Sequence, residues 1–512
     1  MRVLYIDCDS LQPDHLGCYG YDRDTSPNID RLAEDGRRFT NCYSSDVPCG
    51  PSRTALLSGR FGFHTGVDNH AGINADVRSR GPNREVGNRG DYRTLPTALR
   101  DAGYHTALVS PFPQRHNAVH VLDGFNEWID TKGGGGERAD VVYERVDEWL
   151  DDNVTDDDWF LHVNFWDPHT HYDTPEEFGN PFEDDPLPGW MDAERLADHC
   201  ESYGPHSAHD VHHGYLYGDG PPEGVPRVPD EIADMDDYRR WIDGYDVGIR
   251  YMDQYIGRIL SRLEAEGVRE DTLVIFSADH GENLGELNVY GDHQTADHWT
   301  ARVPLIVDGP DVSEGIDDEL RYQLDLVPTL TEFVGGDVAA GWDGESFADS
   351  LTAGADGDEG RSSLVITQGT WACQRGVRWD GWILLRTYHD GLKDFAPVEL
   401  YDLDSDPHET ENLARECPHV VREGLALLDD WRDERLREAA VGENGGIPEA
   451  PRALADPLFE IMREGGPYYT RGAVESYADR LRETGREDHA DRIERTEGVV
   501  EQPVETYLAG GD

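Results

Sequence analysis

The sequence is short of lysine and of positive charge in general. Lys132 and Lys393 are the only lysines among 45 basic residues, whereas 105 residues are acidic, so the formal net charge of the 512-residue chain is −60. Proteins that bind nucleic acid neutralise its phosphates with clusters of lysine and arginine. This chain instead spreads acidic side chains over its whole length. We therefore expect no nucleic-acid partner.

Long apolar segments are also missing. No stretch approaches the roughly 18 apolar residues that a membrane-spanning helix needs, so we expect no membrane span. The chain opens on a strand-like run, with neither an apolar signal segment nor a twin-arginine leader. These observations predict a cytoplasmic protein.

Cysteines are few and show no pairing pattern. The seven thiols belong to Cys8, Cys18, Cys42, Cys49, Cys200, Cys373 and Cys417. An odd number without paired spacing indicates neither a disulfide framework nor a zinc site.

The acidic excess needs its own explanation. Strongly acidic chains are often disordered, but 12 Trp, 23 Tyr and clear apolar segments indicate a folded core. In 1 M salt the Debye length is only about 3 Å, so charge repulsion is screened. An acidic surface then keeps a protein soluble. We predict a halophilic protein from a salty cytoplasm, which needs salt on the order of molar for folding and activity.

Strand-like and helix-like segments alternate over the first two thirds of the chain. Strands are expected at Val3–Cys8, Tyr104–Ser110, Trp159–Trp166, Leu273–Ser277 and Val303–Val307. Helices are expected at 26–36, 94–103, 141–150 and 236–267, and residues 168–235 are expected to be long surface loops. Such alternation predicts the α/β class, with a parallel sheet covered by helices.

The last third of the chain has a different pattern. Residues 335–360 are rich in glycine and aspartate and are predicted to be a linker or insertion. Strands are expected at 363–368, 382–388 and 399–403, and a helix over 420–440. From 441 to 512 the chain is charged, broken by glycine and proline, and shows no catalytic motif. The length suits one large domain plus a smaller one, or three modest domains.

The most informative string is Cys-Gly-Pro-Ser-Arg at residues 49–53, followed by Thr-Ala-Leu-Leu-Ser-Gly-Arg. Pro51 suits the first position of a helix, because the N–H that proline lacks has no intrahelical partner there. Cys49 is then expected just before a helix N-terminus, which favours an anion. Arg53, about one turn further on, could pair with a nucleophile's oxygen or with a substrate. A buried cysteine before an ordinary capped helix is the alternative.

Three polar clusters follow predicted strands. They are Asp7-Cys8-Asp9-Ser10, Asp167-Pro168-His169-Thr170-His171 and Ser277-Ala278-Asp279-His280. Because sites in open α/β sheets form at the carboxyl ends of strands, the clusters are expected to mark one site. Carboxylate oxygens suit a hard divalent cation such as Ca²⁺. One imidazole is tolerated there but would also suit Mn²⁺ or Zn²⁺.

The string from Cys49 to Arg60 resembles the signature of the type I sulfatases, which belong to the alkaline phosphatase-like superfamily. The resemblance covers residues 1–340 and again 363–415. It implies an α/β, alkaline-phosphatase-like sandwich with a central, mostly parallel sheet, plus a small C-terminal α+β domain. The implied parts are a catalytic domain at 1–340, a sheet-and-helix domain at 361–440, and an acidic, partly helical extension at 441–512.

The resemblance also implies the cofactors. In sulfatases the signature cysteine is oxidised after synthesis to formylglycine, which makes Cys49 the precursor of the nucleophile and a formylglycine-generating enzyme a partner. One divalent metal, Ca²⁺, would be held by Asp9, Asp279 and His280. Arg53 would hold the hydrated aldehyde, one hydroxyl of which attacks sulfur.

A histidine is implied as the proton donor to the leaving alcohol. His171 matches the family's histidine best and His169 second. His116 is the other candidate for this role. After the donation, the second hydroxyl of the hydrate would collapse the intermediate and release sulfate.

Three positions depart from the family pattern. Ser10 stands where a second metal-binding aspartate is common, and Asp7 is the candidate substitute. Residues 113–116, Pro-Gln-Arg-His, replace a usual Gly-Lys-Trp-His, so Arg115 would supply the lysine charge and His116 the histidine. His293 stands where a lysine usually contacts sulfate, which replaces a fixed cation by one that titrates near neutral pH.

The sequence thus predicts a sulfuric ester hydrolase for a sulfated small molecule or carbohydrate. A phosphonate monoester or phosphodiester hydrolase of the same superfamily would share the fold, the metal and the formylglycine. A non-catalytic metal-binding homologue is the third possibility and follows if Cys49 is never oxidised. Fold alone does not separate the three.

Overall fold

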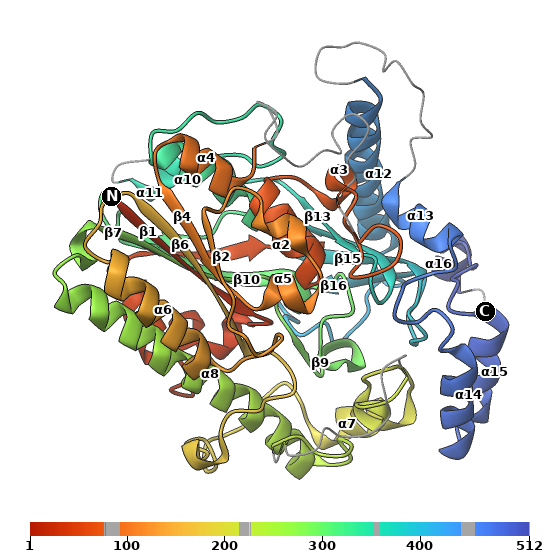
Figure 1. Cartoon of the computed structure of the whole chain (residues 1–512). Helices are drawn as coiled ribbons and strands as arrows, with labels where there is room; N and C mark the ends of the chain where they lie inside the picture. Colours follow the sequence, from red (N-terminus) through yellow and green to blue (C-terminus); the bar gives the residue numbers. More distant parts are fainter. Residues whose placement is uncertain are drawn as a thin grey trace.

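A nine-stranded sheet forms the centre of the computed structural model, which describes residues 1–75, 77, 93–214, 225, 227–352, 359–441 and 456–510 (Figure 1). The strand order is β11-β2-β10-β7-β1-β6-β4-β5, and β12 also pairs with β2. The strands are β1 (Arg2–Asp9), β2 (Arg37–Tyr43), β4 (His105–Val109), β5 (Glu127–Ile129), β6 (Trp159–Pro168), β7 (Thr272–Ala278), β10 (Arg302–Asp308), β11 (Gly315–Asp317) and β12 (Arg321–Tyr322).

Most neighbours in this sheet are parallel. β1 runs parallel to β6 and β7, and β4 runs parallel to β5 and β6. β10 is the exception, since it runs antiparallel to both β7 and β2. β1, β6 and β7 are buried along their whole length, as near-continuous apolar strands of a sheet covered on both faces should be. The predicted α/β class with a mostly parallel sheet is confirmed.

Helices cover both faces of the sheet (Figure 1). One face packs against α1 (Pro27–Asp35), α6 (Ala139–Asn153) and α8 (Met235–Ala265), and the other against α2 (Cys49–Ser58), α4 (Leu95–Asp101) and α10 (Leu326–Phe333). Short elements in the connections are α3 (Gly62–Thr65), α5 (Phe112–Arg115), α7 (Ala193–Glu201), α9 (His298–Ala301), α11 (Ala348–Leu351), and a small sheet of β8 (Asn283–Leu284) with β9 (Tyr290–Asp292).

A second, five-stranded sheet follows in the chain but borrows one strand from the first half. Its order is β16-β15-β14-β13-β3, with β3 (Asp46–Val47), β13 (Leu364–Gln368), β14 (Cys373–Trp379), β15 (Trp382–His389) and β16 (Val398–Asp402). β3 pairs in parallel with β13 and directly precedes α2. The helix α12 (Pro418–Val441) packs on β14 and β15. The segment that carries Cys49 is therefore attached to both sheets.

The C-terminal residues 456–510 form four helices beside the second sheet (Figure 1). They are α13 (Pro457–Arg463), α14 (Val474–Glu483), α15 (Glu487–Thr496) and α16 (Val504–Leu508). A buried ion pair of 2.8 Å joins Asp456 to Arg375 of β14, and Leu458 and Ile461 pack against Cys373. Within the described residues no helix has both the length and the apolar character needed to cross a membrane.

Several sequence expectations need correction. Residues 168–235 are not simply surface loops, because they contain α7 and buried residues such as Tyr203 and Asp210. Residues 335–360 contain α11 and the buried Phe347; residues 353–358 of this predicted linker lie outside the described residues. The strands β2 and β14 were not predicted, since their mixed polar sequences lack the alternation that marks a strand.

Candidate active site

The three polar clusters meet at the carboxyl ends of β1, β6 and β7. The strand registers place Asp7 beside Asn164 on one side and Ser277 on the other. Asp9 ends β1, and Asp279 directly follows β7. Both carboxylates are fully buried, as is Asp7. The parallel order of these strands therefore gathers carboxylates that are far apart in the sequence.

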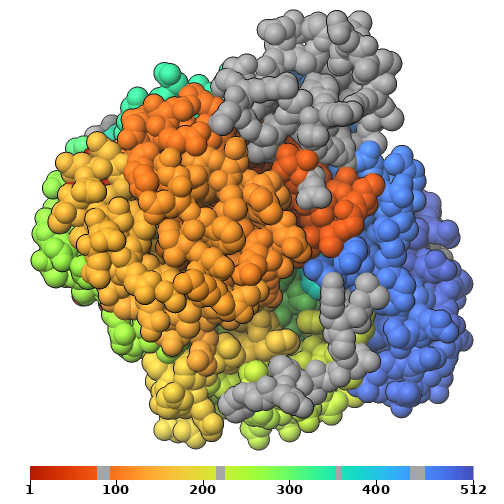
Figure 2. Space-filling view, viewed as in Figure 1, coloured from red at the N-terminus to blue at the C-terminus, as the bar shows by residue number. Residues whose placement is uncertain are grey.

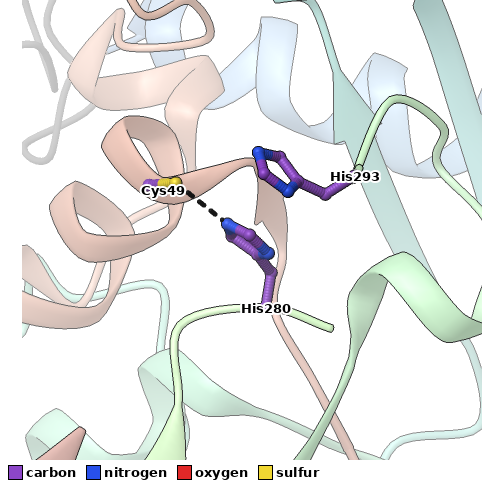
Figure 3. Close-up of side chains that lie close together, drawn as sticks. All are labelled: Cys49, His280 and His293. Atoms are coloured by element: carbon purple, nitrogen blue, oxygen red, sulfur yellow. Dashed lines mark hydrogen bonds between the residues drawn. The ribbon is translucent and has the colours of Figure 1, made fainter. Parts of the chain in front are cut away.

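Cys49 lies in the first turn of α2 and faces this cluster. Its Sγ is 3.0 Å from His280 Nε2 and 3.8 Å from Asp9 Oδ1 (Figure 3). The helix begins at Cys49 rather than at the predicted Pro51, so Cys49 is inside its first turn and not before it. Every residue of α2 is buried. Burial, followed by the negative charge of Asp9 and Asp279, raises the pKa of the Cys49 thiol well above its ordinary value.

Arg53 lies one turn along α2 and pairs with all three carboxylates. Its Nε is 3.1 Å from Asp7, one terminal nitrogen is 3.1 Å from Asp9, and the same nitrogen pairs with Asp279. Burial raises the pKa of the Asp9 and Asp279 carboxyls, and the guanidinium of Arg53 opposes this effect. Because buried charges are costly unless paired, Arg53 is what allows three carboxylates to sit together.

Ser10, which departs from the family pattern, adds no carboxylate to the cluster but hydrogen-bonds two of its carboxylates. Its backbone N–H donates to Asp279 Oδ1 at 3.1 Å, and its hydroxyl donates to Asp9 Oδ1 at 3.3 Å. Asp7 brings a third carboxylate to the same point, through its contact with Arg53. The role of Asp7 as a substitute metal ligand stays a prediction.

The donor set fits a divalent cation. One ligand atom from each of Asp9, Cys49, Asp279 and His280 lies within 4.8 Å of the others. His280 Nδ1 is 2.7 Å from the Gly281 carbonyl, so its proton sits on Nδ1, and the lone pair of Nε2 faces Cys49 Sγ at 3.0 Å. Asp7 Oδ1 is buried without a hydrogen-bond donor. Carboxylate oxygens with one neutral imidazole can bind Ca²⁺, and also Mn²⁺ or Zn²⁺.

His293 brings positive charge to the same side of Cys49 as His280, and the two ring centroids are 4.2 Å apart (Figure 3). Its Nδ1 is 3.3 Å from Glu282 and its Nε2 is 3.5 Å from Asp292. Burial lowers the pKa of His293, but Asp292 and Glu282 outweigh that effect and raise the pKa to about 9. The imidazole is thus positively charged at neutral pH, as a lysine would be.

The remaining predicted histidines lie at different depths. His169 is closest to the carboxylates, with Nε2 3.9 Å from Asp9 Oδ1 and its ring stacked on Trp166 at 3.8 Å. His171 is more exposed and its ring lies 6.3 Å from that of His212. His116 packs against His70, with 4.8 Å between the ring centroids. Burial lowers the pKa of His169, His171 and His116, so all three are neutral at neutral pH.

One cavity of about 350 Å³ opens onto these groups. Arg115 lines it, with its guanidinium 3.3 Å from the centroid of the Trp166 ring. The lining residues are Cys49, His70, Arg115, His116, His169, Thr170, His171, His206, Val211, His212, His213, Gly291, Asp292, His293, Trp371 and Tyr469. Its floor is Cys49, and cationic or neutral nitrogen groups dominate its walls. Such a cavity suits a small anionic substrate.

Sequence reasoning missed several residues of this cavity, among them His70, Asp292, Trp371 and Tyr469. His70 Nε2 accepts a hydrogen bond from the Gly50 N–H at 3.1 Å, in the first turn of α2. Asp292 ends the three-residue strand β9, and Trp371 and Tyr469 lie in connections without a periodic pattern. For Tyr469, which lies in the extension that carried no motif, no sequence signal could have found it.

The chain matches the sulfatase family model over residues 2–336. It is 22% identical to an N-acetylglucosamine-6-O-sulfatase of Bacteroides thetaiotaomicron, with 85% of this chain and 86% of that protein aligned. It is 26% identical to a choline-sulfatase of Rhizobium meliloti, over 86% of this chain and 88% of that protein.

Solved structures show the same fold. A structure in complex with its substrate D-glucosamine-2-N,6-O-disulfate superposes with a TM-score of 0.67 at 21% identity, covering 85% of this chain and 98% of that one. A phosphonate monoester hydrolase of Agrobacterium radiobacter superposes with a TM-score of 0.63 at 20% identity, covering 88% and 100%. Together with the family match, these findings show that the chain belongs to the sulfatase family, in the alkaline phosphatase-like superfamily, and is a sulfuric ester hydrolase.

Proposed function

We propose that this protein hydrolyses the sulfate ester of a small molecule or carbohydrate in the Cys49 cavity, with Cys49 converted to formylglycine and Ca²⁺ bound beside it. The observation that carries the proposal is the convergence of Cys49, Asp9, Asp279 and His280 at the floor of a cavity with cationic walls. A formylglycine-generating enzyme is the implied partner.

The state of Cys49 supports the modification. A thiolate, not a thiol, is the nucleophilic form of cysteine, and burial beside two carboxylates keeps the Cys49 thiol protonated by raising its pKa. Formylglycine supplies a hydrated aldehyde as the nucleophile and needs no thiolate. Arg53, at the next turn of α2, would hold the modified side chain and offset the surrounding carboxylates.

Asp9, Asp279 and His280 would hold the metal, with Asp7 as a fourth donor. When bound, a divalent cation lowers the pKa of an adjacent hydroxyl and neutralises charge on the substrate. Ser10 keeps Asp9 and Asp279 in place through its two hydrogen bonds. His280 is oriented by its bond to the Gly281 carbonyl, which fixes the tautomer.

Arg115 and His293 would bind the sulfate group. They are the cations that line the cavity without belonging to the carboxylate cluster. Asp292 and Glu282 keep His293 charged, so it replaces the family's lysine at neutral pH. The Arg115 guanidinium is planar and can make two parallel hydrogen bonds to sulfate oxygens.

His169 is our first choice as the group that protonates the leaving alcohol, ahead of His171 and His116. It is the one of the three with a nitrogen within 4 Å of Asp9, at 3.9 Å. Its pKa is lowered by burial, but a bound sulfate ester would raise it, since opposite charge favours the protonated form. A general acid with a pKa near the working pH is the efficient one.

A phosphonate monoester or phosphodiester hydrolase is the second candidate, because the fold superposes on a phosphonate monoester hydrolase with a TM-score of 0.63. A panel of sulfated sugars, aryl sulfates, alkyl sulfates and phosphodiesters separates the two. The assay uses protein in molar KCl, with formylglycine at residue 49 verified by mass. Turnover of phosphodiesters but no sulfate ester would overturn the proposal. Unmodified Cys49 in inactive protein would indicate a metal-binding homologue.

The proposed site of the reaction is the cytoplasm of a cell with a high internal salt concentration. The net charge of −60 supports a halophilic protein that works in a salty cytoplasm. A cytoplasmic location favours small or pre-cut substrates over long polysaccharides. Fractionation of the native cells with an antibody to this protein tests the location.

A further inference from the structure

Two aromatic rings from outside the family match form one wall of the cavity. Trp371 lies between β13 and β14, and Tyr469 follows α13 in the C-terminal extension. Their ring centroids are 4.1 Å apart and their planes differ by 22°, so they are stacked. Both side chains are half-buried and line the same cavity as Cys49. Figure 2 shows the C-terminal residues, in blue, at one side of a hollow in the surface.

The wall is held in place from both sides. Gln368 donates to the His293 carbonyl at 2.9 Å and accepts from the Thr370 N–H at 2.8 Å, which ties the Trp371 turn to the sulfate-binding side of the cavity. On the other side, Asp456 pairs with the buried Arg375 and caps α13, the helix that precedes the connection carrying Tyr469. Because the two side chains are already held in place, they lose little conformational entropy when a ligand binds against them.

Histidines form much of the rest of the cavity lining, beside the Asp292 carboxylate. His171, His206 and His212 are among them, and burial lowers the pKa of each. A neutral imidazole has one N–H donor and one acceptor nitrogen. His212 Nε2 is 2.9 Å from the Pro229 carbonyl, and His206 Nδ1 is 3.1 Å from Asp292. Together with the Asp292 carboxylate, these rings form a polar lining that matches the hydroxyl groups of a polyol.

We propose that Trp371 and Tyr469 form a leaving-group subsite that selects sulfate esters of ring-shaped polyhydroxy alcohols, such as one sugar unit, over straight-chain alcohols. The C–H face of the ring would stack on the aromatic wall while its hydroxyls meet the histidines. The cavity volume of about 350 Å³ is at the small end of the range of about 300–1,000 Å³ for ligand pockets, which suits one ring with its sulfate. The inference rests on the proposed sulfate ester hydrolysis and makes the C-terminal extension part of the active site.

The test compares two substrates on the wild type, three subsite variants and one control variant. N-acetylglucosamine 6-sulfate is the ring substrate and ethyl sulfate the straight-chain one, with sulfate release giving kcat and KM. The proteins are the wild type, Tyr469→Leu, Trp371→Leu and Tyr469→Phe, all in molar KCl. Leucine keeps apolar volume against the partner ring but removes one aromatic face. Phe459→Ala is the matched control, because Phe459 is a 40% exposed aromatic side chain on α13 outside the cavity lining.

We expect KM for the sugar sulfate to rise about three- to tenfold in both leucine variants, the range of one aromatic contact. Tyr469→Phe and Phe459→Ala should match the wild type, and kcat/KM for ethyl sulfate should be unchanged in all variants. An equal fall for both substrates would indicate a merely structural role and overturn the subsite, as would no change for either. A wild type that hydrolyses neither ester would overturn the proposed function itself, whereas turnover of ethyl sulfate alone would overturn only the subsite. If a leucine variant shows a lower melting temperature, the ratio of its kcat/KM values for the two substrates still decides, since a merely structural loss lowers both values equally.

Discussion

The carboxylate of Asp210 is the central link between the C-terminal extension and the cavity. It is fully buried and accepts hydrogen bonds from Tyr477 Oη at 2.8 Å, Arg480 Nε at 3.2 Å and Arg486 at 2.9 Å. The same loop carries His206 and His212, which line the cavity. Asp210→Asn keeps the size of the side chain but removes the charge that two guanidinium groups share.

The expected loss follows from burial. Removing one partner of a buried ion pair costs about 3–5 kcal/mol, and we expect the lower end because Arg480 is 27% exposed and can recover water. A loss of about 3 kcal/mol in the local opening of α14 and α15 corresponds to roughly a hundredfold faster hydrogen exchange of their amides. Molar salt should not rescue the variant, because buried pairs are weakly screened.

Native-state hydrogen exchange measured by mass spectrometry is the assay. Asp491→Asn is the control, since Asp491 pairs with Arg482 of the neighbouring helix at 3.3 Å but is 72% exposed. A surface pair of this kind contributes about 0–1 kcal/mol, so exchange should change less than about fivefold. If Asp210→Asn changes exchange in α14 and α15 by no more than the control does, the buried carboxylate does not hold the extension.

The remaining predictions concern the chemistry at Cys49 and the solvent. In active protein the tryptic fragment containing residue 49 should be lighter than the same fragment with an unmodified cysteine, by the exchange of SH₂ for O. An unmodified Cys49 in fully active protein would refute the formylglycine mechanism. Asp279→Ala should abolish both metal binding, measured by calorimetry, and turnover, because the removal of one charged ligand from so small a set greatly weakens the affinity for the metal. The pKa of His293 is raised to about 9, so the charge of its imidazole is present below that pH and is lost as pH rises through it. With the charge, the substrate loses a charge-assisted hydrogen bond of about 1.5–3 kcal/mol. We therefore expect kcat/KM to fall roughly ten- to a hundredfold on the alkaline side. His293→Lys should flatten this alkaline fall, and identical pH profiles for the two proteins would show that His293 does not meet the substrate. The melting temperature should rise strongly from millimolar to molar KCl, and an unchanged value would count against a halophilic origin.

The floor of the site could be predicted because it depends on local patterns. Asp9 and Asp279 each follow a short apolar strand, and the ends of parallel strands meet at one edge of a sheet. Cys49 and Arg53 are one turn apart on a helix whose start the proline marks to within two residues. Such features need no knowledge of distant contacts.

The wall of the site could not be predicted because it depends on tertiary contacts. Tyr469 lines the cavity beside Trp371, and the segment that carries it is tied to β14 by the pair of Asp456 with Arg375. Neither the pair nor the direction of the turn after α13 is visible in the sequence. Arg375 also lies in β14, and polar residues of this kind hid the buried strand from a prediction based on apolar pattern. The choice between His169 and His171 was also open, since both follow β6 and only their depths differ.

The pairing of β3 with β13 has a consequence for the order of folding. Asp46 lies beside Thr367, so the segment just before Cys49 gains its strand partner only after more than half of the chain has been synthesised. Contacts between residues so distant in sequence form late and slowly. During synthesis α2 therefore lacks the support of the second sheet, and a fragment ending near residue 340 would leave β3 unpaired. The ribosome therefore finishes residues 1–340, the predicted catalytic domain, before β13 exists to complete the sheet beside Cys49.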